Sequence, residues 1–391
     1  MSVQTRERLR AFPFVLAIAA SAILILSAPF IGELRSAIRA RFPGHFVTIV
    51  GAAVALATAG ALVAAMVRIR DRRPLRYGLI AAALVLAVVY SIESGLGNPE
   101  SDVVERFHFI EYGVITLLFY RAWRPLEDAG VLALPVLAGL AVGTCDEWFQ
   151  WFIPARIGEM RDVFLNLAAI ISGLLFSLAL DPPDQVPWSL GRRSLRQIAG
   201  VALFTTVLFA AFVDCVHIGY AVGNPEIGWF RSIYTASELE ELSRDRRSRW
   251  ASAPPLTRPP RLSREDQYMS EGLWHVQARN RAWSAGDIQS AWYENRILEQ
   301  YFAPVLDTPS YVSKAGHRWS PEQHADAERR ANLTPGQVST FVSHAQDPFP
   351  IFVWSRVIYW VVIAAIGICL LGSYLVLGRT KQKEVRRSGG H

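Results

Sequence analysis

The sequence predicts an all-α polytopic membrane protein with about eight transmembrane helices and a small helical domain outside the membrane. Three observations support this fold class. Hydrophobic residues make up 51% of the 391 positions, which is a high share for a soluble protein of this length. They gather in separate runs, each close to the ~18 apolar residues that cross a bilayer as a helix. A long stretch before the last run is polar and contains no such run.

Eight apolar runs are long enough to be expected spans. The fourth is the weakest, because it contains His108 and Glu111. The first follows three arginines, as a signal peptide would. It is longer than a typical signal-peptide core and has no clear cleavage site, so we expect a retained anchor. The runs are Ala11–Ile31, Phe46–Val67, Leu75–Ile92, Phe107–Trp123, Val131–Phe149, Val163–Leu180, Ile198–Ala221 and Ile351–Leu377.

The runs divide the chain into five expected parts. The first two are an N-terminal two-helix membrane segment (1–74) and a membrane core (75–181). A cytoplasmic loop with the seventh helix (182–222) follows. The last two parts are a helical extramembrane domain (223–350) and the final helix with its basic tail (351–391).

Basic residues outside the runs predict the orientation, because lysine and arginine favour the cytoplasmic side. Both tails are basic, and so are the loops at 68–76, 120–128 and 181–196. We therefore expect an inner (cytoplasmic) membrane protein with cytoplasmic termini and with residues 223–350 extracytoplasmic. The loop Glu33–His45 is an exception, since it should lie outside yet contains three arginines. We expect a short interfacial helix there, whose arginines reach lipid head groups.

The remaining composition argues against several classes of function. The net charge of +6 comes mostly from loop arginines, so it reports topology and predicts no nucleic-acid partner. The cysteines Cys145, Cys215 and Cys369 lie within or beside apolar runs, which predicts no disulfide framework. No P-loop, nucleophile elbow or zinc-ligand spacing is present, and we expect no cofactor.

Costly polar side chains collect at the expected outer ends of three runs. Ionisable groups at membrane depth usually face the interior of a helix bundle and pair there, so we expect these residues to meet. One interpretation is structural: ion pairs, a helix cap at Asp162 and interhelical hydrogen bonds from Asn166. The other is an outward-facing pocket that binds a ligand. The candidate ligand-binding residues are His108, Glu111, Tyr112, Asp146, Glu147, Gln150, Arg156, Arg161, Asp162 and Asn166.

The order and spacing of these motifs resemble the VanZ-like family. The elements are His-Phe-x-Glu-Tyr at 108–112, Asp-Glu-x-x-Gln at 146–150, Pro154-x-Arg156, and Arg161-Asp162 with Asn166 four residues beyond the aspartate. Many members have glycine three residues after that asparagine. This chain has Ala169 there, and keeps Gly173. The resemblance covers roughly Leu75–Leu180.

The resemblance implies an integral membrane protein of the teicoplanin-resistance type, associated with the cell envelope. The family's founding member is linked to low-level resistance to teicoplanin, a glycopeptide, and does not belong to the enzymes that remake the peptidoglycan precursor. No biochemical mechanism comes with the resemblance, so the role of this chain has to be argued from its residues.

The leading hypothesis is a cell-envelope protein that binds an anionic membrane lipid, a lipid-linked wall intermediate or a glycopeptide-related ligand. Arg156 and Arg161 would meet its phosphate or carboxylate, and the acids would position them. An enzyme acting on a lipid-linked substrate is the first alternative, with His108 as acid or base. We assign no catalytic residue. A metal site is disfavoured because the set offers one convincing histidine, so we assign no metal ligand.

The second alternative is a scaffold that recruits a protein partner through residues 223–350. In this stretch, apolar stripes predict a helical hairpin over Arg264–Trp283 and 288–302. Ser237 and Glu240 suggest a capping box, and Ser320-Pro321 the start of another helix. The segment Ser252–Ser263 is typical of a proline-rich linker. We expect Trp274, Trp283 and Trp292 to belong to the core of this domain.

Overall fold

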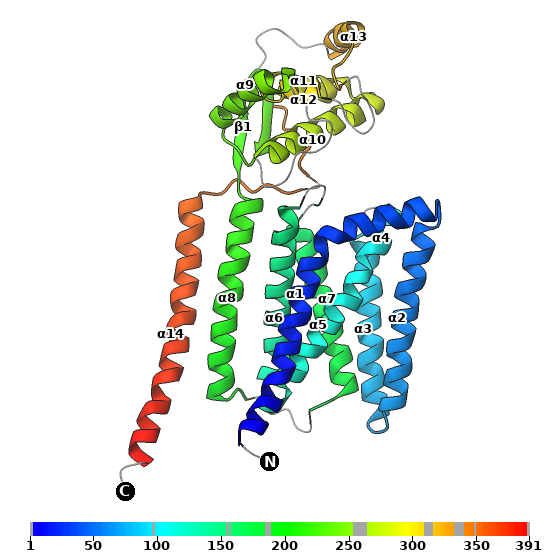
Figure 1. Ribbon diagram of the computed structural model, residues 1–391. Helices are drawn as coiled ribbons and strands as arrows, with labels where there is room; N and C mark the ends of the chain where they lie inside the picture. The colour runs from blue at the N-terminus through cyan, green and yellow to red at the C-terminus, as the bar shows by residue number, and fades with distance from the viewer. Residues whose placement is uncertain are drawn as a thin grey trace. The chain divides into compact units, whose positions relative to one another are not determined.

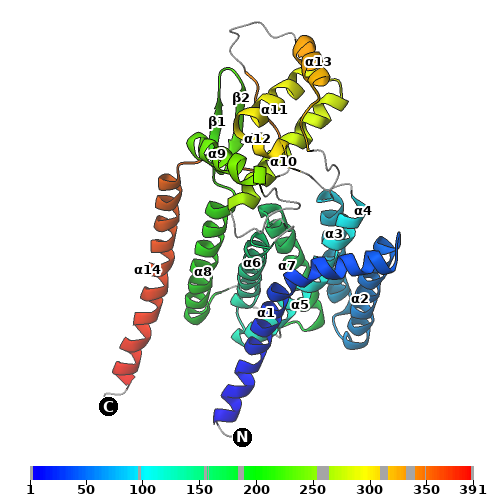
Figure 2. The same cartoon turned by 45° about the horizontal axis from the view of Figure 1, so that its top comes forward.

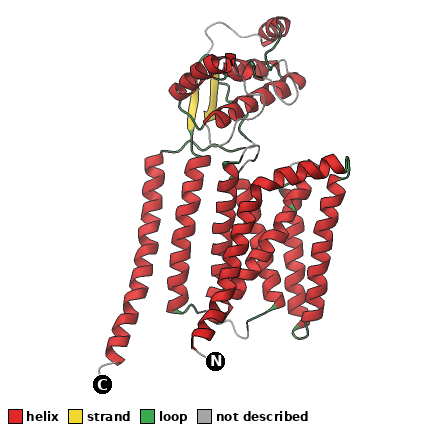
Figure 3. Cartoon of the chain, viewed as in Figure 1, coloured by secondary structure: helices red, strands yellow, loops and turns green. Residues whose placement is uncertain are grey.

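A computed structural model describes residues 3–95, 98–153, 156, 158–183, 189–252, 264–308, 316–331, 340–347 and 349–388. The chain divides into two compact units. The first, which we call the membrane unit, comprises residues 1–150, 158–212 and 360–391. The second, the domain unit, comprises 151–157 and 213–359. Apart from one two-stranded sheet, the regular structure in the described ranges is helical, which confirms the all-α class (Figure 3).

Long helices build the membrane unit, and α14 begins in the domain unit. They are α1 (Val3–Arg41), α2 (Phe46–Arg68), α3 (Arg73–Glu93), α6 (Gly130–Trp151), α7 (Met160–Leu180), α8 (Arg192–Val216) and α14 (Arg356–Ser388) (Figure 1). Each contains a stretch long and apolar enough to cross a membrane, which confirms a multi-pass membrane protein. The remaining expected span, the fourth in chain order, is also a helix, α5 (Phe107–Trp123). Its 17 residues fall just short of the ~18 that a bilayer requires, so its crossing stays a prediction.

Glycines allow α5, α6 and α7 to pack closely. A Cβ on Gly173 of α7 would lie 2.8 Å from Gly113 Cα of α5. On α6, a Cβ on Gly139 would lie 3.0 Å from the Ile170 side chain, and one on Gly143 would lie 3.1 Å from Asn166 Cβ. Small residues let helix backbones approach in this way, and in lipid such packing supplies much of the association energy.

The C-terminal end of α7 is capped by side chains from other helices. Arg76 is buried, and its Nε and Nη2 donate to the carbonyls of Ala179 (2.6 Å) and Leu180 (2.8 Å). Arg68 Nε donates to Leu180 O as well, at 3.3 Å. The last carbonyls of a helix have no partner within it and carry partial negative charge, so two guanidinium groups stabilise this end. Arginines read in the sequence as topology signals therefore also have a structural role.

The C-terminal third of α1 departs from the direction of its first part. Figures 1 and 2 show α1 turning and then lying across the ends of neighbouring helices near the short helix α4 (Pro99–Glu105). Pro29 lies inside the helix about two thirds of the way along it, and proline is the common cause of such kinks. Residues 33–41 of the expected interfacial helix are therefore helical as part of α1, and their place at a membrane interface stays a prediction. Two of the three arginines in this stretch have protein contacts: Arg35 and Arg39 lie over the Phe46 ring, and Arg39 pairs with Glu100.

In the domain unit, two short strands precede the helices. Strand β1 (Tyr220–Asn224) pairs antiparallel with β2 (Gly228–Ser232), and Val222 lies opposite Phe230. The expected seventh span, to Ala221, was therefore too long, since α8 ends at Val216. Periodicity could not reveal this, because the apolar residues of α8 and β1 form one continuous run. Gly219 fits between them because a Cβ there would lie 2.2 Å from Ser232 O.

The helices of the domain unit confirm the expected hairpin. They are α9 (Ala236–Ser252), α10 (Arg264–Ser284), α11 (Ile288–Tyr301), α12 (Ala303–Leu306) and α13 (Pro321–Ala331). The expected capping box at Ser237 and Glu240 was wrong by two residues. Thr235 and Glu238 form it instead, because Glu238 N donates to Thr235 Oγ1 (3.3 Å) and Thr235 N to Glu238 Oε2 (3.0 Å).

Several smaller expectations about the domain unit have clear outcomes. Ser320 caps α13 as expected: Gln323 N donates to its Oγ at 3.2 Å. Trp292 is buried against α13, and Trp283 packs against the same cluster. Trp274 stacks on Phe349, with ring centroids 5.1 Å apart. Most of the expected linker Ser252–Ser263 lies outside the described residues, as does Pro154 of the loop motif.

The chain enters and leaves the domain unit side by side. Phe352 N donates to His217 O (2.7 Å) and Gly219 N to Phe352 O (3.0 Å), a parallel pairing. Arg356, the first residue of α14, donates from Nε to Asp214 Oδ1 (3.1 Å) and from Nη2 to Ile218 O (2.9 Å). The start of α14 is thereby tied to the end of α8.

Replacing Arg76 by alanine should destabilise the protein, because the last carbonyls of α7 lose a buried charged donor. Hydrogen bonds to charged groups contribute about 1.5–3 kcal/mol, so we expect a lower thermal midpoint in detergent. Arg70→Ala removes an exposed arginine of the same loop and is the control. Equal midpoints for the two variants would contradict the capping role.

Replacing Gly173 by valine should push α5 away from α7, because the new side chain would overlap Gly113. Overpacking typically costs about 1–3 kcal/mol. Gly60→Val in α2, where nothing lies within 4 Å of the added Cβ, controls for the change in helix propensity. The comparison is made by thermal unfolding, and a loss no greater than that of Gly60→Val would show that this contact is unimportant.

Candidate functional site

Five polar side chains from α5, α6 and α7 meet in a buried cluster. Tyr112 Oη of α5 and Gln150 Nε2 of α6 both donate to Asp146 Oδ2, each at 3.0 Å. Gln150 Nε2 also lies 3.3 Å from Glu147 Oε1, to which Asn166 Nδ2 of α7 donates at 3.3 Å. All five are at most 5% exposed. Polar groups so deeply buried are stable when they bond to one another, as these do.

Sequence spacing explains why these groups meet. Asp146 and Gln150 are one turn apart on α6, so both face the same neighbours. Gly143, three residues before Asp146, lets Asn166 and the Tyr112 ring approach the α6 backbone: an added Cβ would lie 3.1 Å from the first and 3.5 Å from the second. The glycine packing of the bundle thus positions the cluster.

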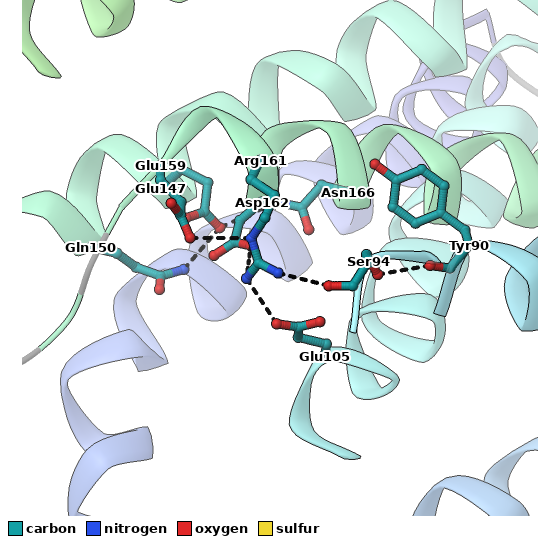
Figure 4. A network of polar contacts seen from close by, with 9 residues as sticks. All are labelled: Tyr90, Ser94, Glu105, Glu147, Gln150, Glu159, Arg161, Asp162 and Asn166. Carbon is teal, nitrogen blue, oxygen red and sulfur yellow. Dashed lines mark hydrogen bonds and ion pairs between the residues drawn. The ribbon is translucent and has the colours of Figure 1, made fainter. Parts of the chain in front are cut away.

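Arg161, at the start of α7, forms a second and more accessible half of the site (Figure 4). Its Nη2 contacts Glu105 Oε1 at 2.8 Å and Asp162 Oδ1 at 3.0 Å, and its Nε donates to Glu159 Oε1 at 3.2 Å. Its Nη1 donates to Ser94 O at 2.9 Å. The guanidinium therefore joins the end of α3 and the end of α4 to the start of α7. Its side chain remains 28% exposed.

Asp162 and Asn166, one turn apart on α7, connect the two halves. Asp162 contacts Arg161, and Asn166 bonds to Glu147. The Oδ1 atom of Asn166 is buried and accepts no hydrogen bond within the described part of the chain. We refer to Tyr112, Asp146, Glu147, Gln150, Arg161, Asp162 and Asn166 together as the polar cluster.

The other three expected residues have different places. His108 is half-buried and stacks on the Tyr112 ring, with centroids 6.0 Å apart, so it borders the cluster. Glu111 is half-buried on the same helix. Arg156 belongs to the segment 151–157 of the domain unit.

Sequence reasoning missed the partners of Arg161. Glu105 ends α4, just before the fourth apolar run, and Glu159 lies two residues before Arg161. Burial raises the pKa of Glu159, and the Arg161 guanidinium partly offsets that shift. The only sign of these partners in the sequence was their position beside an apolar run. That sign is weak, because an acidic residue beside a membrane span usually faces water. Ser94 contributes only its backbone carbonyl, which no side-chain pattern can reveal.

The arrangement suits hydrogen bonding to a polar group better than metal binding. Among the described residues, no three His, Cys, Asp or Glu side chains are placed so as to hold a metal ion. The cluster instead combines carboxylate and amide acceptors with one guanidinium. Such a set can bind a group that has both hydrogen-bond donors and acceptors.

One comparison with known proteins bears on this site. Residues 14–181 match the family model described as VanZ/LLP1. Residues 14–181 are VanZ-like. The match begins well before Leu75, where the sequence resemblance was expected to start, so α1 and α2 belong to the family region too. The whole polar cluster lies within it, whereas α8, α14 and residues 213–359 of the domain unit lie outside. No curated protein and no solved structure matches the chain.

A second buried polar group lies in the domain unit, and the sequence did not predict it. His275 Nδ1 bonds to Glu294 Oε2 (2.6 Å), and Ser343 Oγ donates to Glu294 Oε1 (2.5 Å). This is not the geometry of a hydrolytic triad, in which the serine bonds to the second histidine nitrogen. Here that nitrogen, Nε2, bonds to Gln346 at 2.9 Å. The group therefore holds α10, α11 and the segment 340–347 together.

Glu271 of α10 is fully buried beside this group. Its carboxylate accepts hydrogen bonds from Ser232 Oγ (2.5 Å), Ile233 N (3.1 Å) and Gln267 Nε2 (3.2 Å). Burial raises the pKa of Glu271, and these hydrogen bonds partly offset the shift. Its neutral form is consequently favoured more in the folded than in the unfolded state.

Glu271→Gln should flatten the pH dependence of domain stability. With a raised folded pKa, the stabilising contribution of Glu271 is complete below the unfolded value of about 4.3 and is lost as the pH rises through the folded pKa. Pulse proteolysis of the full chain across this range measures the effect. Glu241→Gln, at an exposed position of α9, should retain the wild-type slope. Identical slopes for all three proteins would show that Glu271 does not titrate as inferred.

Proposed function

We propose that this VanZ-like protein acts in the cell envelope by binding the head group of a membrane lipid or lipid-linked wall intermediate at the polar cluster. The observation that carries the proposal is Arg161. Its side chain is partly exposed, and its guanidinium is held by three carboxylates and a carbonyl and lies beside buried groups that can accept hydrogen bonds. A positioned arginine at the end of a membrane helix is a common site for an oxygen-rich head group.

Hydrogen-bond counting supports an open position at Arg161. A guanidinium has five N–H donors, two of them on Nη1. The described contacts engage Nε and Nη2, and one N–H of Nη1 bonds to Ser94 O. A second N–H of Nη1 is thus left for a ligand oxygen.

The surrounding charge favours one kind of head group. Three carboxylates contact this guanidinium, so a bare phosphate at Arg161 would also meet their repulsion. A head group with hydroxyl or amide donors can instead bond to those carboxylates while one of its oxygens bonds to Arg161. A lipid-linked sugar has this combination. In this proposal the acids orient Arg161, as the sequence hypothesis held, and also contact the ligand.

Two alternatives remain, each with its own test. An enzyme acting on a lipid-linked substrate would use His108, which stacks on Tyr112 at the edge of the cluster. In that case His108→Ala would lose turnover while retaining binding. A scaffold that recruits a protein partner through residues 223–350 would instead lose its function when that segment is deleted, and would tolerate changes in the polar cluster that leave folding intact.

The proposed topology is that of the sequence analysis. The start of α1 and the end of α14 lie at the same end of the membrane unit (Figure 1). Basic tails favour the cytoplasm for that end. Residues 223–350, between α8 and α14, are then extracytoplasmic.

Arg161→Ala should abolish lipid retention. Native mass spectrometry of the mildly solubilised protein should show a co-purifying lipid adduct for the wild type and none for the variant. Arg124→Ala is a matched control, because Arg124 pairs with Asp181 (3.3 Å) at the opposite end of α7 and is similarly exposed. It should retain the adduct.

The proposal fails if a folded Arg161→Ala protein retains the full adduct. Thermal unfolding establishes folding for each variant. Arg161→Lys adds a second test, since lysine keeps the charge but cannot bridge several acceptors as the planar guanidinium does. We expect partial loss of the adduct for this variant.

A further inference from the structure

The segment of α1 that follows Pro29 has to lie at a membrane boundary. The helix has 39 residues, or about 58 Å at ~1.5 Å per residue, which is far more than the ~30 Å of a hydrocarbon core. Helix α2, itself long enough to span, begins at Phe46. A chain that leaves one span and enters the next must run along the interface between them. Figures 1 and 2 show this stretch lying across the ends of other helices in the membrane unit.

The segment is amphipathic. Phe30, Leu34 and Ala37 lie three or four residues apart and share one face, and all three are exposed. Two charged residues, Glu33 and Arg41, are exposed on the same side, Glu33 at its edge and Arg41 at the C-terminal end of the segment. Phe30 is 65% exposed and Leu34 is 55% exposed. Gly32, Ser36 and Ala40 lie on another exposed face, which has no large apolar side chain. Ile31, Arg35 and Ile38 are half-buried toward the protein.

Two of the three arginines of the segment, Arg35 and Arg39, contact the protein. The Arg39 guanidinium lies 5.1 Å from the centre of the Phe46 ring and forms an ion pair with Glu100 of α4. Arg35 also lies over that ring, at 5.9 Å. These contacts fix the rotation of the helix about its axis, and so determine which face points away from the protein.

We propose that residues 30–42 form an in-plane membrane anchor, with Phe30, Leu34 and Ala37 seated in lipid at the head-group boundary. The occupant is lipid because the anchor continues directly into a span at each end, so its exposed apolar face lies at the depth where acyl chains begin. Large apolar side chains on one face, with small and polar residues on another, are typical of interfacial helices.

The anchor also bears on the polar cluster, in a step that rests on the proposed function. The short helix α4 supplies Glu100 to Arg39 and Glu105 to Arg161. It is therefore held by the anchor through one glutamate and by the polar cluster through the other. The anchor sets the position of α4, and with it the position of Glu105 at the side of Arg161.

Spin labels test the lipid contact directly. In a full-length protein whose native cysteines are replaced by serine, a label is placed at Leu34→Cys or, as a matched control, at Ser36→Cys. Both positions are exposed on the same helix. In phospholipid vesicles, the label at position 34 should collide several-fold more with oxygen, relative to a water-soluble nickel chelate, than the label at 36.

Two results would overturn the anchor. Equal ratios of oxygen to nickel-chelate collisions at positions 34 and 36 would show that both faces are in the same surroundings, so that neither is selectively seated in lipid. Low collision with both reagents at position 34 would mean that protein, such as a second copy of this chain, covers the face. Phe30→Cys compared with Ala40→Cys repeats the test one turn away, in case one labelled variant fails to fold.

A separate measurement tests the link to the cluster. Leu34→Ser should speed hydrogen exchange of the α4 amides and weaken the lipid adduct of the wild type, whereas Ser36→Ala should do neither. If the spin labels report lipid contact but hydrogen exchange of the α4 amides is unchanged in Leu34→Ser, the anchor stands and its link to the polar cluster is rejected. A wild type without any adduct would reject the proposed function and leave the anchor standing.

Discussion

The close contact of α5 with α7 is the constraint on which the membrane unit depends. In lipid, helices gain little from hiding apolar surface, so association relies on close packing and on polar contacts. The absence of side chains at Gly113 and Gly173 brings the two backbones together. This approach places Tyr112 of α5 next to the α6 acids and lets Asn166 of α7 reach Glu147. Without it, the buried carboxylates would lose the donors that make their burial tolerable.

Helix α7 is held at both ends by arginines that act in different ways. At its C-terminal end, Arg76 and Arg68 satisfy backbone carbonyls, and their role is complete within the protein. At its N-terminal end, Arg161 contacts side chains from other elements and remains partly exposed. A cation is unfavourable near a helix N-terminus, so the surrounding carboxylates offset that cost. The same residue type thus closes one end of the helix and remains partly accessible at the other.

Much of this organisation could be predicted from the sequence, because membrane helices and their polar interruptions are strong signals. The one-turn spacing of Asp146 and Gln150, and of Asp162 and Asn166, was enough to predict faces that meet.

The features that sequence reasoning missed have specific causes. Strand β1 continues the apolar run of α8 without a break, so the run concealed a change in secondary structure. Glu105 belongs to the site only because α4 lies beside the start of α7, which depends on tertiary structure, and Glu159 was missed although it is two residues from Arg161. The arginines of the first loop contradicted the charge rule. In the structure, Arg39 is paired with Glu100, so its charge is a poor guide to the side of the membrane.

The parallel pairing of residues 217–219 with 350–352 has a consequence for how this chain could have arisen. The two backbone segments run side by side, and Arg356 pairs with Asp214. The chain between them therefore begins and ends at one place, which we call the neck. The residues from Tyr220 to Phe349 are, in topological terms, a cassette inserted into a turn between two membrane helices. Gaining, losing or exchanging such a cassette breaks the chain at a single place, the neck, where α8 and α14 would keep the contacts that join them. Residues 151–157, from another part of the chain, belong to the same unit as the cassette. Diversity in this cassette can therefore evolve while the polar cluster of the VanZ-like region stays the same.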